Sequence, residues 1–128
     1  MSKVLLGLAL WFPLSAALLW PVLSSSQARL QGTYTCKGLQ GGESYTMYLV
    51  VQELGKTYEF RWSPSERDPA VLAGLGVLHG DQLAVALASP NGGIGAALYT
   101  VKPGRLEGIW TRGDGNLESE TCTSGRTA

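Results

Sequence analysis

The chain has little of the side-chain chemistry on which most enzymes rely. It contains a single histidine, His79, and it lacks the Gly-x-Ser-x-Gly segment that presents a nucleophilic serine. The Gly113-Asp114-Gly115 segment lacks the spaced carboxylates of a calcium loop. With only two cysteines beside one histidine, the sequence also falls short of the four ligands of a structural zinc site. These absences predict a protein that is not an enzyme and that holds neither a cofactor nor a metal.

The chain also lacks an excess of charge of either sign. Its formal net charge is zero, and no stripe of basic residues follows any segment. Nucleic acid binding needs clustered lysine and arginine to neutralise phosphates, so a nucleic acid partner is excluded. No amphipathic helical period follows the N-terminal region, and the 17 glycines favour short strands joined by tight turns.

The N-terminal region is typical of a secretory signal. Lys3 gives a positive start, residues 4–23 are almost entirely apolar, and small residues follow up to Ala28. We therefore predict a signal helix over residues 1–28, with cleavage between Ala28 and Arg29, and an exported product in the periplasm or the medium. An uncleaved membrane anchor is the alternative, because an apolar stretch of about 20 residues can span a bilayer.

Residues 29–128 read as one all-β domain. Alternation of apolar and polar residues is clearest at Tyr58, Phe60 and Trp62, and turn signals rich in glycine separate the extended segments. The predicted strands cover residues 32–38, 43–53, 56–63, 71–78, 82–88, 94–102, 105–111 and 117–123. Eight antiparallel strands with short connections avoid exposed edges best by closing, so we predict an up-and-down barrel. A two-sheet sandwich is the alternative.

Cys36 and Cys122 fall in the first and last predicted strands. These strands are neighbours in a closed barrel, so a disulfide would link the first strand to the last at the seam where the barrel closes. Export would favour oxidation of the two thiols. Two free thiols or a metal pair are the alternatives.

Five residues are candidates for lining a ligand cavity: Tyr34, Tyr58, Trp62, Trp110 and Glu120. An eight-stranded barrel is either filled by side chains or just wide enough for one small ligand. Strand alternation places Glu118 and Glu120 on the face of Cys122, so Glu120 is expected to point inward if the disulfide lies inside the barrel.

A buried carboxylate needs hydrogen-bond donors. The hydroxyls of Tyr34 and Tyr45 and the indoles of Trp62 and Trp110 are the candidates. Glu120 could be a polar anchor for a ligand, a tie between the seam strands, or an outward-facing side chain.

A glycine–aromatic rhythm runs through the whole of this domain. It comprises Gly32-x-Tyr34, Tyr45, Gly55-x-x-Tyr58-x-x-x-Trp62, Gly74-x-Gly76, Gly80-Asp81-x-Leu83-Ala84-Val85-Ala86, Tyr99, and Gly104-x-Leu106-x-Gly108-x-Trp110, with Glu120 following. The pattern resembles a family of small exported bacterial β-proteins, and its outline is similar to avidin-like and lipocalin-like barrels. The resemblance implies a bacterial origin, a location in the envelope or medium, and no established enzyme activity. The chain departs from the family at its first turn, Leu39 to Glu43, and in having the cysteine pair.

These observations predict a monomeric, non-enzymatic barrel that binds a small ligand or an envelope partner, with a membrane contact only if the N-terminal segment is retained. An inhibitor of a secreted hydrolase is the first alternative, acting through loop 63–69 or loop 89–93. Adhesion to a host matrix is a weaker one, and an enzyme using Glu118 or Glu120 is weaker still.

Overall fold

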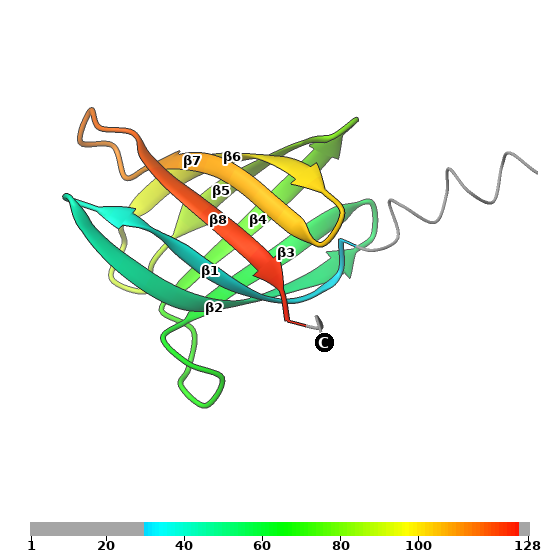
Figure 1. Cartoon of the computed structure of the whole chain (residues 1–128), viewed down its shortest axis with the longest axis horizontal. Coiled ribbons are helices and arrows are strands. Elements are labelled where there is room, and N and C mark those ends of the chain that lie inside the picture. Colours follow the sequence, from blue (N-terminus) through cyan, green and yellow to red (C-terminus); the bar gives the residue numbers. More distant parts are fainter. Residues whose placement is uncertain (1–29, 126–128) are drawn as a thin grey trace, which may run out of the picture.

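The computed structural model describes residues 30–125, which form one closed antiparallel β-barrel (Figure 1). The strands are β1 (Gly32–Gln40), β2 (Glu43–Leu54), β3 (Thr57–Ser63), β4 (Leu72–His79), β5 (Gln82–Ala88), β6 (Ile94–Lys102), β7 (Arg105–Thr111) and β8 (Glu118–Ser124). Each strand pairs with the next, and β1 pairs with β8 to close the barrel. The predicted barrel is confirmed, and the two-sheet sandwich is excluded.

The strand bounds agree with the sequence prediction to within two residues. The largest difference is at β1, which continues to Gln40 because the whole segment from Gly32 pairs with β2. Among residues 30–125 there is no helix with the length and apolar character needed to cross a membrane. The predicted signal helix and its cleavage site at Ala28 and Arg29 lie outside the described residues.

The disulfide between Cys36 and Cys122 joins the first and last strands, as predicted. The two cysteines are direct register partners, and both are fully buried. The covalent link therefore lies at the pairing that closes the barrel.

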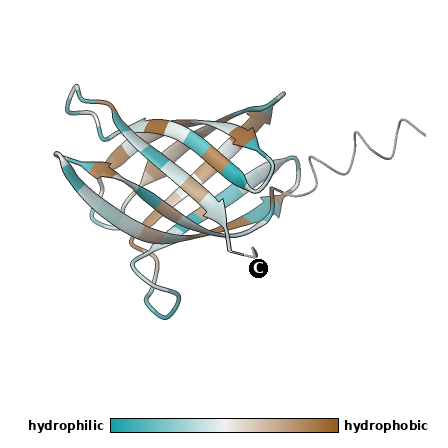
Figure 2. Cartoon of the chain, in the orientation of Figure 1, coloured by the Kyte–Doolittle hydropathy of each residue, from teal (hydrophilic) through white to brown (hydrophobic). Residues whose placement is uncertain are grey.

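The two ends of the barrel differ in how they are filled. At the end where the chain enters, apolar side chains occupy the interior completely, and we call this the filled end. Its residues are Leu30, Tyr34, Val51, Phe60, Leu83 and Leu106. The other end, which we call the mouth, carries the β1–β2, β3–β4, β5–β6 and β7–β8 connections. Hydrophilic residues follow the loops, whereas hydrophobic segments lie along the strands (Figure 2).

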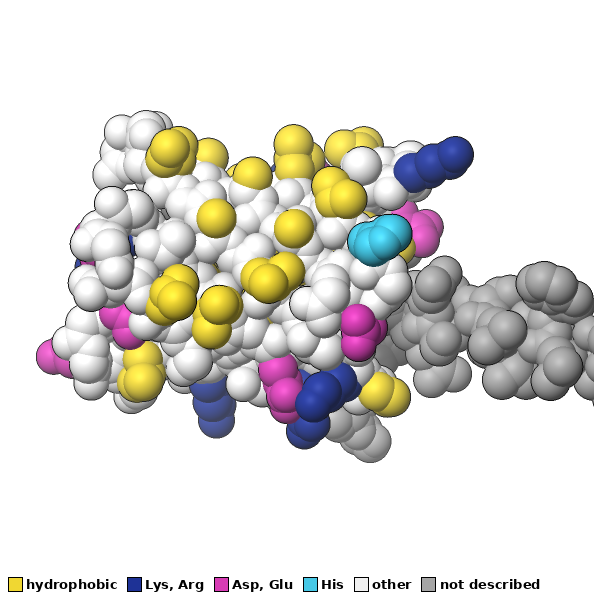
Figure 3. Space-filling view, turned by 90° about the horizontal axis from the view of Figure 1, so that it is seen from above, with side chains coloured by type: hydrophobic (Ala, Val, Ile, Leu, Met, Phe, Trp, Pro, Cys, Tyr) yellow, Lys and Arg dark blue, Asp and Glu magenta, His cyan; other side chains and the backbone are white. Residues whose placement is uncertain are grey.

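The outer surface of β4 to β7 is also apolar. Leu75, Val77, Leu98 and Ile109 all keep more than two fifths of their surface exposed. Apolar side chains are spread across much of this face in the space-filling view (Figure 3). Exposed apolar side chains are therefore more frequent on the outer faces of these strands than on those of β1 to β3, although β7 also carries the outward pair Arg105 and Glu107.

Candidate functional site

The mouth opens into a cavity of about 700 Å³. Its walls come from both sides of the barrel and from the β5–β6 loop. The aromatic part of the lining consists of Tyr45, Trp62, Tyr99 and Trp110, and the aliphatic part of Met47, Leu72, Leu87 and Ile94. The polar side chains that border it are Gln40, Ser89, Asn91, Thr111, Arg112 and Glu120. A mostly apolar cavity with a few polar groups is typical of a small-molecule site.

Glu120 lies at the centre of a row of residues that crosses five neighbouring strands. Its register partners are Gly38 on β1 and Gly108 on β7. Gly38 pairs in turn with Tyr45 on β2, and Gly108 pairs with Tyr99 on β6. The two tyrosines thus approach the same carboxylate from opposite sides, each across a glycine.

Glycine is needed at both intermediate positions. A Cβ atom on Gly38 would lie 2.5 Å from the Tyr45 hydroxyl, and one on Gly108 would collide with the ring of Tyr99. Real Cβ atoms do not come so close to other atoms, so any larger residue would displace the tyrosines. The two glycines therefore create the space through which the tyrosines reach Glu120.

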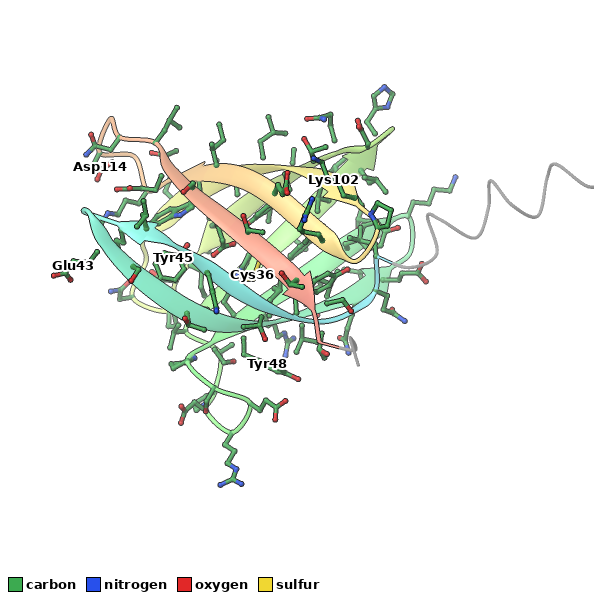
Figure 4. All side chains as sticks on the ribbon, in the orientation of Figure 1. Cys36, Glu43, Tyr45, Tyr48, Lys102 and Asp114 are labelled. Atoms are coloured by element: carbon green, nitrogen blue, oxygen red, sulfur yellow. A yellow bond between two sulfur atoms is a disulfide. The ribbon has the colours of Figure 1, made fainter. Side chains whose placement is uncertain are left out.

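Both phenols donate hydrogen bonds to the carboxylate. The Tyr45 hydroxyl lies 2.7 Å from Glu120 Oε2, and the Tyr99 hydroxyl lies 2.6 Å from Glu120 Oε1. Cys122 Sγ lies 3.4 Å from Oε1, which places the disulfide directly beside the carboxylate. In Figure 4, Tyr45 and Cys36 both lie within the barrel near the β1–β8 seam. Glu120 is thus held by hydrogen bonds from two other strands, β2 and β6.

Burial and the Glu120 charge keep the two phenols protonated. The pKa of Tyr45 is raised above its ordinary value of 10.0, first by desolvation and then by the negative charge and hydrogen bond of Glu120. The pKa of Tyr99 is raised for the same reasons in the same order. Ionising either phenol would place a second negative charge beside the carboxylate. The tyrosines therefore remain hydrogen-bond donors throughout the ordinary pH range.

Two indole N–H groups in the cavity wall are buried without a hydrogen-bond acceptor, those of Trp62 and Trp110. The indole N–H of Trp110 is near the Tyr45 hydroxyl and partly offsets the rise in its pKa. The geometry between the two groups is not that of a hydrogen bond. The rings of Tyr45 and Trp110 pack edge to face, with centroids 6.3 Å apart. Both tryptophans therefore present ring surface rather than a free donor to the cavity.

Three of the five residues predicted to line a cavity do border it: Trp62, Trp110 and Glu120. The other two, Tyr34 and Tyr58, do not. Tyr34 is buried at the filled end, and its hydroxyl donates to the Leu30 carbonyl at 2.7 Å. Tyr34 was one of the candidate donors to Glu120, and its hydroxyl donates to this backbone carbonyl instead. Tyr58 is half-buried and packs against the core.

The inward orientation predicted for Glu120 is confirmed, with 5% of its surface exposed, and the outward alternative is excluded. Tyr45 is confirmed as a donor to it, whereas the indoles of Trp62 and Trp110 are not. Glu118 has a different environment, because its Oε2 accepts a hydrogen bond from the Gly41 amide in the β1–β2 turn.

Sequence reasoning missed Tyr99 and the glycine-rich β5–β6 loop as parts of the site. Register links Tyr99 to Glu120, because Tyr99 pairs with Gly108 and Gly108 pairs with Glu120, and the order of residues alone does not give that register. The loop gave no signal either, because Ser89 to Gly93 reads only as a turn. Both loops proposed for an inhibitor, 63–69 and 89–93, lie at the mouth.

One group of possible metal-ligating residues occurs among residues 30–125, formed by Cys36, Glu120 and Cys122. Their ligand atoms lie within 4.8 Å of one another. Both sulfurs are joined in the disulfide, so neither is a thiolate that could bind a metal. His79 is exposed on the β4–β5 turn at the filled end, far from this group along the barrel.

The connections at the mouth carry an excess of negative charge. Together with the strand-end residues that flank them, Gln40, Glu43 and Glu118, these connections include five carboxylates and two arginines, a net formal charge of −3. The acidic members are Glu43, Glu66, Asp68, Asp114 and Glu118, and the basic members are Arg67 and Arg112. Glu43 and Asp114 lie at the same end of the barrel in Figure 4. Arg112 Nε lies 3.4 Å from Asp114 Oδ2, so part of its charge is already paired.

The fold has a counterpart among solved structures. The chain is similar to a de novo designed fluorescence-activating β-barrel, with 19% sequence identity and a TM-score of 0.57. The alignment covers 74% of this chain and 93% of the designed one. At this identity the likeness shows the fold alone.

No protein-family model matches the chain, and neither does any curated protein. The resemblance to exported bacterial β-proteins therefore stays a prediction.

Proposed function

We propose that this protein is a non-enzymatic binding protein that holds one small, largely apolar molecule in the mouth half of its barrel. The observation that carries the proposal is the difference between the two ends. One end is packed with side chains, while the other contains a cavity of about 700 Å³ with aromatic and aliphatic walls. That volume lies within the range of about 300–1,000 Å³ found for small-molecule sites.

Two further observations support the proposal. The buried Glu120, held by its phenol donors, gives the interior of the cavity a fixed charged group, which can orient a ligand. The structural neighbour is described as fluorescence-activating, which is compatible with ligand binding by a barrel of this fold.

The proposal includes action outside the cytoplasm. The disulfide between Cys36 and Cys122 is compatible with an oxidising compartment, because such bonds persist mainly in exported proteins. The apolar segment over residues 4–23 supports the same location.

Binding can be tested with Nile red, a neutral apolar dye whose emission rises in apolar surroundings. We expect the purified protein to bind it, and Met47→Trp to weaken binding about tenfold, or about 1.4 kcal/mol, by filling the cavity. Thr46→Trp is the matched control, because Thr46 is the exposed neighbour of Met47 on β2. Equal dye affinity in the two variants would contradict binding in this cavity.

A further inference from the structure

We propose that the ligand is an apolar organic cation, a protonated amine on an aromatic or aliphatic body, with its nitrogen placed against Glu120. This inference rests on the proposed function and specifies the chemical class that the same cavity selects. It depends on the charge, hydrogen bonding and surroundings of Glu120.

Glu120 is the one buried charged side chain among residues 30–125. The ion pairs found in this part of the chain all join other residues, so no lysine, arginine or histidine neutralises it there. Burial of a carboxylate without a cation is costly unless hydrogen bonds or a partner charge compensate it. A ligand that brings a positive charge would provide the missing compensation.

The carboxylate has room for further hydrogen bonds. Tyr45 and Tyr99 supply one donor to each oxygen, whereas a carboxylate can accept about four hydrogen bonds. Glu120 also borders the cavity. A protonated amine in the cavity could therefore donate to Glu120 while both tyrosines stay bonded.

The walls beside Glu120 are suited to an organic cation. Tyr45, Trp62, Tyr99 and Trp110 surround the cavity with aromatic rings. The faces of such rings attract ammonium groups, tryptophan most strongly, and the attraction increases when water is excluded. Leu72, Leu87 and Ile94 offer aliphatic surface for the rest of the ligand.

The mouth favours the entry of a cation. Its loops and the strand ends that flank them carry a net formal charge of −3, and one of the two arginines is paired with Asp114. A cleft with charge of one sign raises the local concentration of oppositely charged ligands. An anionic ligand would meet repulsion at the loops and again at Glu120.

The inference can be tested with three ligands that share one diphenylmethyl body: benzhydrylamine, diphenylmethanol and diphenylacetate. Isothermal titration calorimetry at neutral pH should give the tightest binding for the amine, by about tenfold or more over the alcohol, and the weakest for the acid. Equal affinity for amine and alcohol, or tighter binding of the acid, would overturn the inference. If none of the three binds and Nile red also fails to bind, it is the proposed function that fails.

Glu120→Gln should remove the preference for the amine while leaving the affinity for the alcohol within about twofold, since glutamine keeps a similar shape without the charge. Glu107→Gln is the matched control, because Glu107 is a partly exposed glutamate of β7 near the filled end and does not border the cavity, and it should retain the preference. An unchanged preference in Glu120→Gln would contradict the assignment of Glu120. If that variant fails to fold, the three-ligand comparison on the natural sequence still decides the charge preference.

Discussion

Glu120 shows how one buried charge can be maintained in a small apolar interior. Its two oxygens each accept a short hydrogen bond from a tyrosine that belongs to a strand two positions away. Hydrogen bonds to an ionised group are stronger than those between neutral groups, so the phenols offset part of the cost of burial. The same interaction ties β2 and β6 to the seam strand β8.

The tyrosines make stability sensitive to alkaline pH. The raised pKa of Tyr99 means that the folded protein keeps this proton after the unfolded chain has lost it. Stability from Tyr99 is therefore fully present below pH 10 and declines as the pH rises above it. We expect a loss of about 1 kcal/mol from Tyr99 between pH 10 and pH 11. Tyr45 adds a smaller loss because it is only half-buried.

Urea unfolding at pH 8, 10 and 11 measures this effect. Tyr99→Phe should be less stable than the natural protein at pH 8, because Glu120 loses a donor, yet it should lose less stability between pH 10 and pH 11. If the free energy of unfolding fell by the same amount in both proteins between pH 10 and pH 11, Tyr99 would not be the source of the pH dependence.

At the residue scale, the sequence predicted part of the site. Alternation along β8 correctly turned Glu120 inward, and the chemistry of a buried carboxylate correctly suggested Tyr45 as a donor. Tyr34 was an equally reasonable donor by residue type, but it lies at the filled end. The choice between Tyr34 and Tyr45 as donor depends on their positions along the barrel axis. Those positions follow from the register between strands, which the order of residues does not give.

At the scale of the strand, β4 depends on its two inward-facing glycines. Gly74 and Gly76 are buried, and a Cβ atom on Gly76 would lie 2.6 Å from Cε1 of Phe60. The aromatic ring occupies the space that a side chain on β4 would otherwise fill. At this point of the core, the large side chain of Phe60 packs directly against the backbone of Gly76.

This pairing predicts the effect of Gly76→Ala. The added methyl group should cost about 1–3 kcal/mol of unfolding free energy, because Phe60 cannot move away inside a packed core. In a Phe60→Leu background the same change should cost clearly less, since the smaller side chain leaves room. Urea unfolding of the four proteins gives the coupling energy. Additive costs, within about 0.5 kcal/mol, would show that Phe60 is not the obstacle.

The positions of the strands were easier to predict than which face of each strand points into the barrel. In β3 one face is apolar and the other polar, so alternation identified both the strand and its orientation. In β4 and β6 the outward residues Leu75, Val77 and Leu98 are apolar as well. Composition and turn signals still identified these strands, but the pattern alone does not say which side faces the interior.

For the molecule as a whole, the disulfide fixes the closure of the barrel. Cys36 and Cys122 are separated by 86 residues in the sequence, so the link encloses nearly the entire domain. In the chain-entropy model, a loop of this length contributes about 4–5 kcal/mol by restricting the unfolded chain. The pairing of β1 with β8 has the greatest sequence separation of any strand pair here and gains most from this restriction.

We therefore expect Cys36→Ala/Cys122→Ala to lose about 4 kcal/mol of unfolding free energy. Mass spectrometry after alkylation without reductant should show no modified thiol in the natural protein. Urea unfolding of the oxidised and the reduced natural protein, both without added ligand, gives a second comparison. Equal urea midpoints would contradict a stabilising role for the disulfide.

The barrel and its closure followed from the sequence, whereas the position of the cavity did not. Eight strands, short turns and a cysteine in each terminal strand are sufficient to predict closure. Whether the interior is filled depends on which side chains, contributed by different strands, lie at the same height along the barrel axis. Phe60 and Leu83 both pack against Gly76 in the filled interior, while Met47 and Leu87 border the cavity near the mouth.

Both ends of the described chain leave the barrel at the filled end. Leu30 covers that end from inside, and the Gly125 amide donates to the Thr33 carbonyl beside it (Figure 1). A fusion partner, an affinity tag or a sensor surface joined directly to Leu30 or Gly125 would therefore sit opposite the mouth. Immobilised molecules would present their cavities to solution, so the barrel is suited to ligand capture on a solid support without circular permutation.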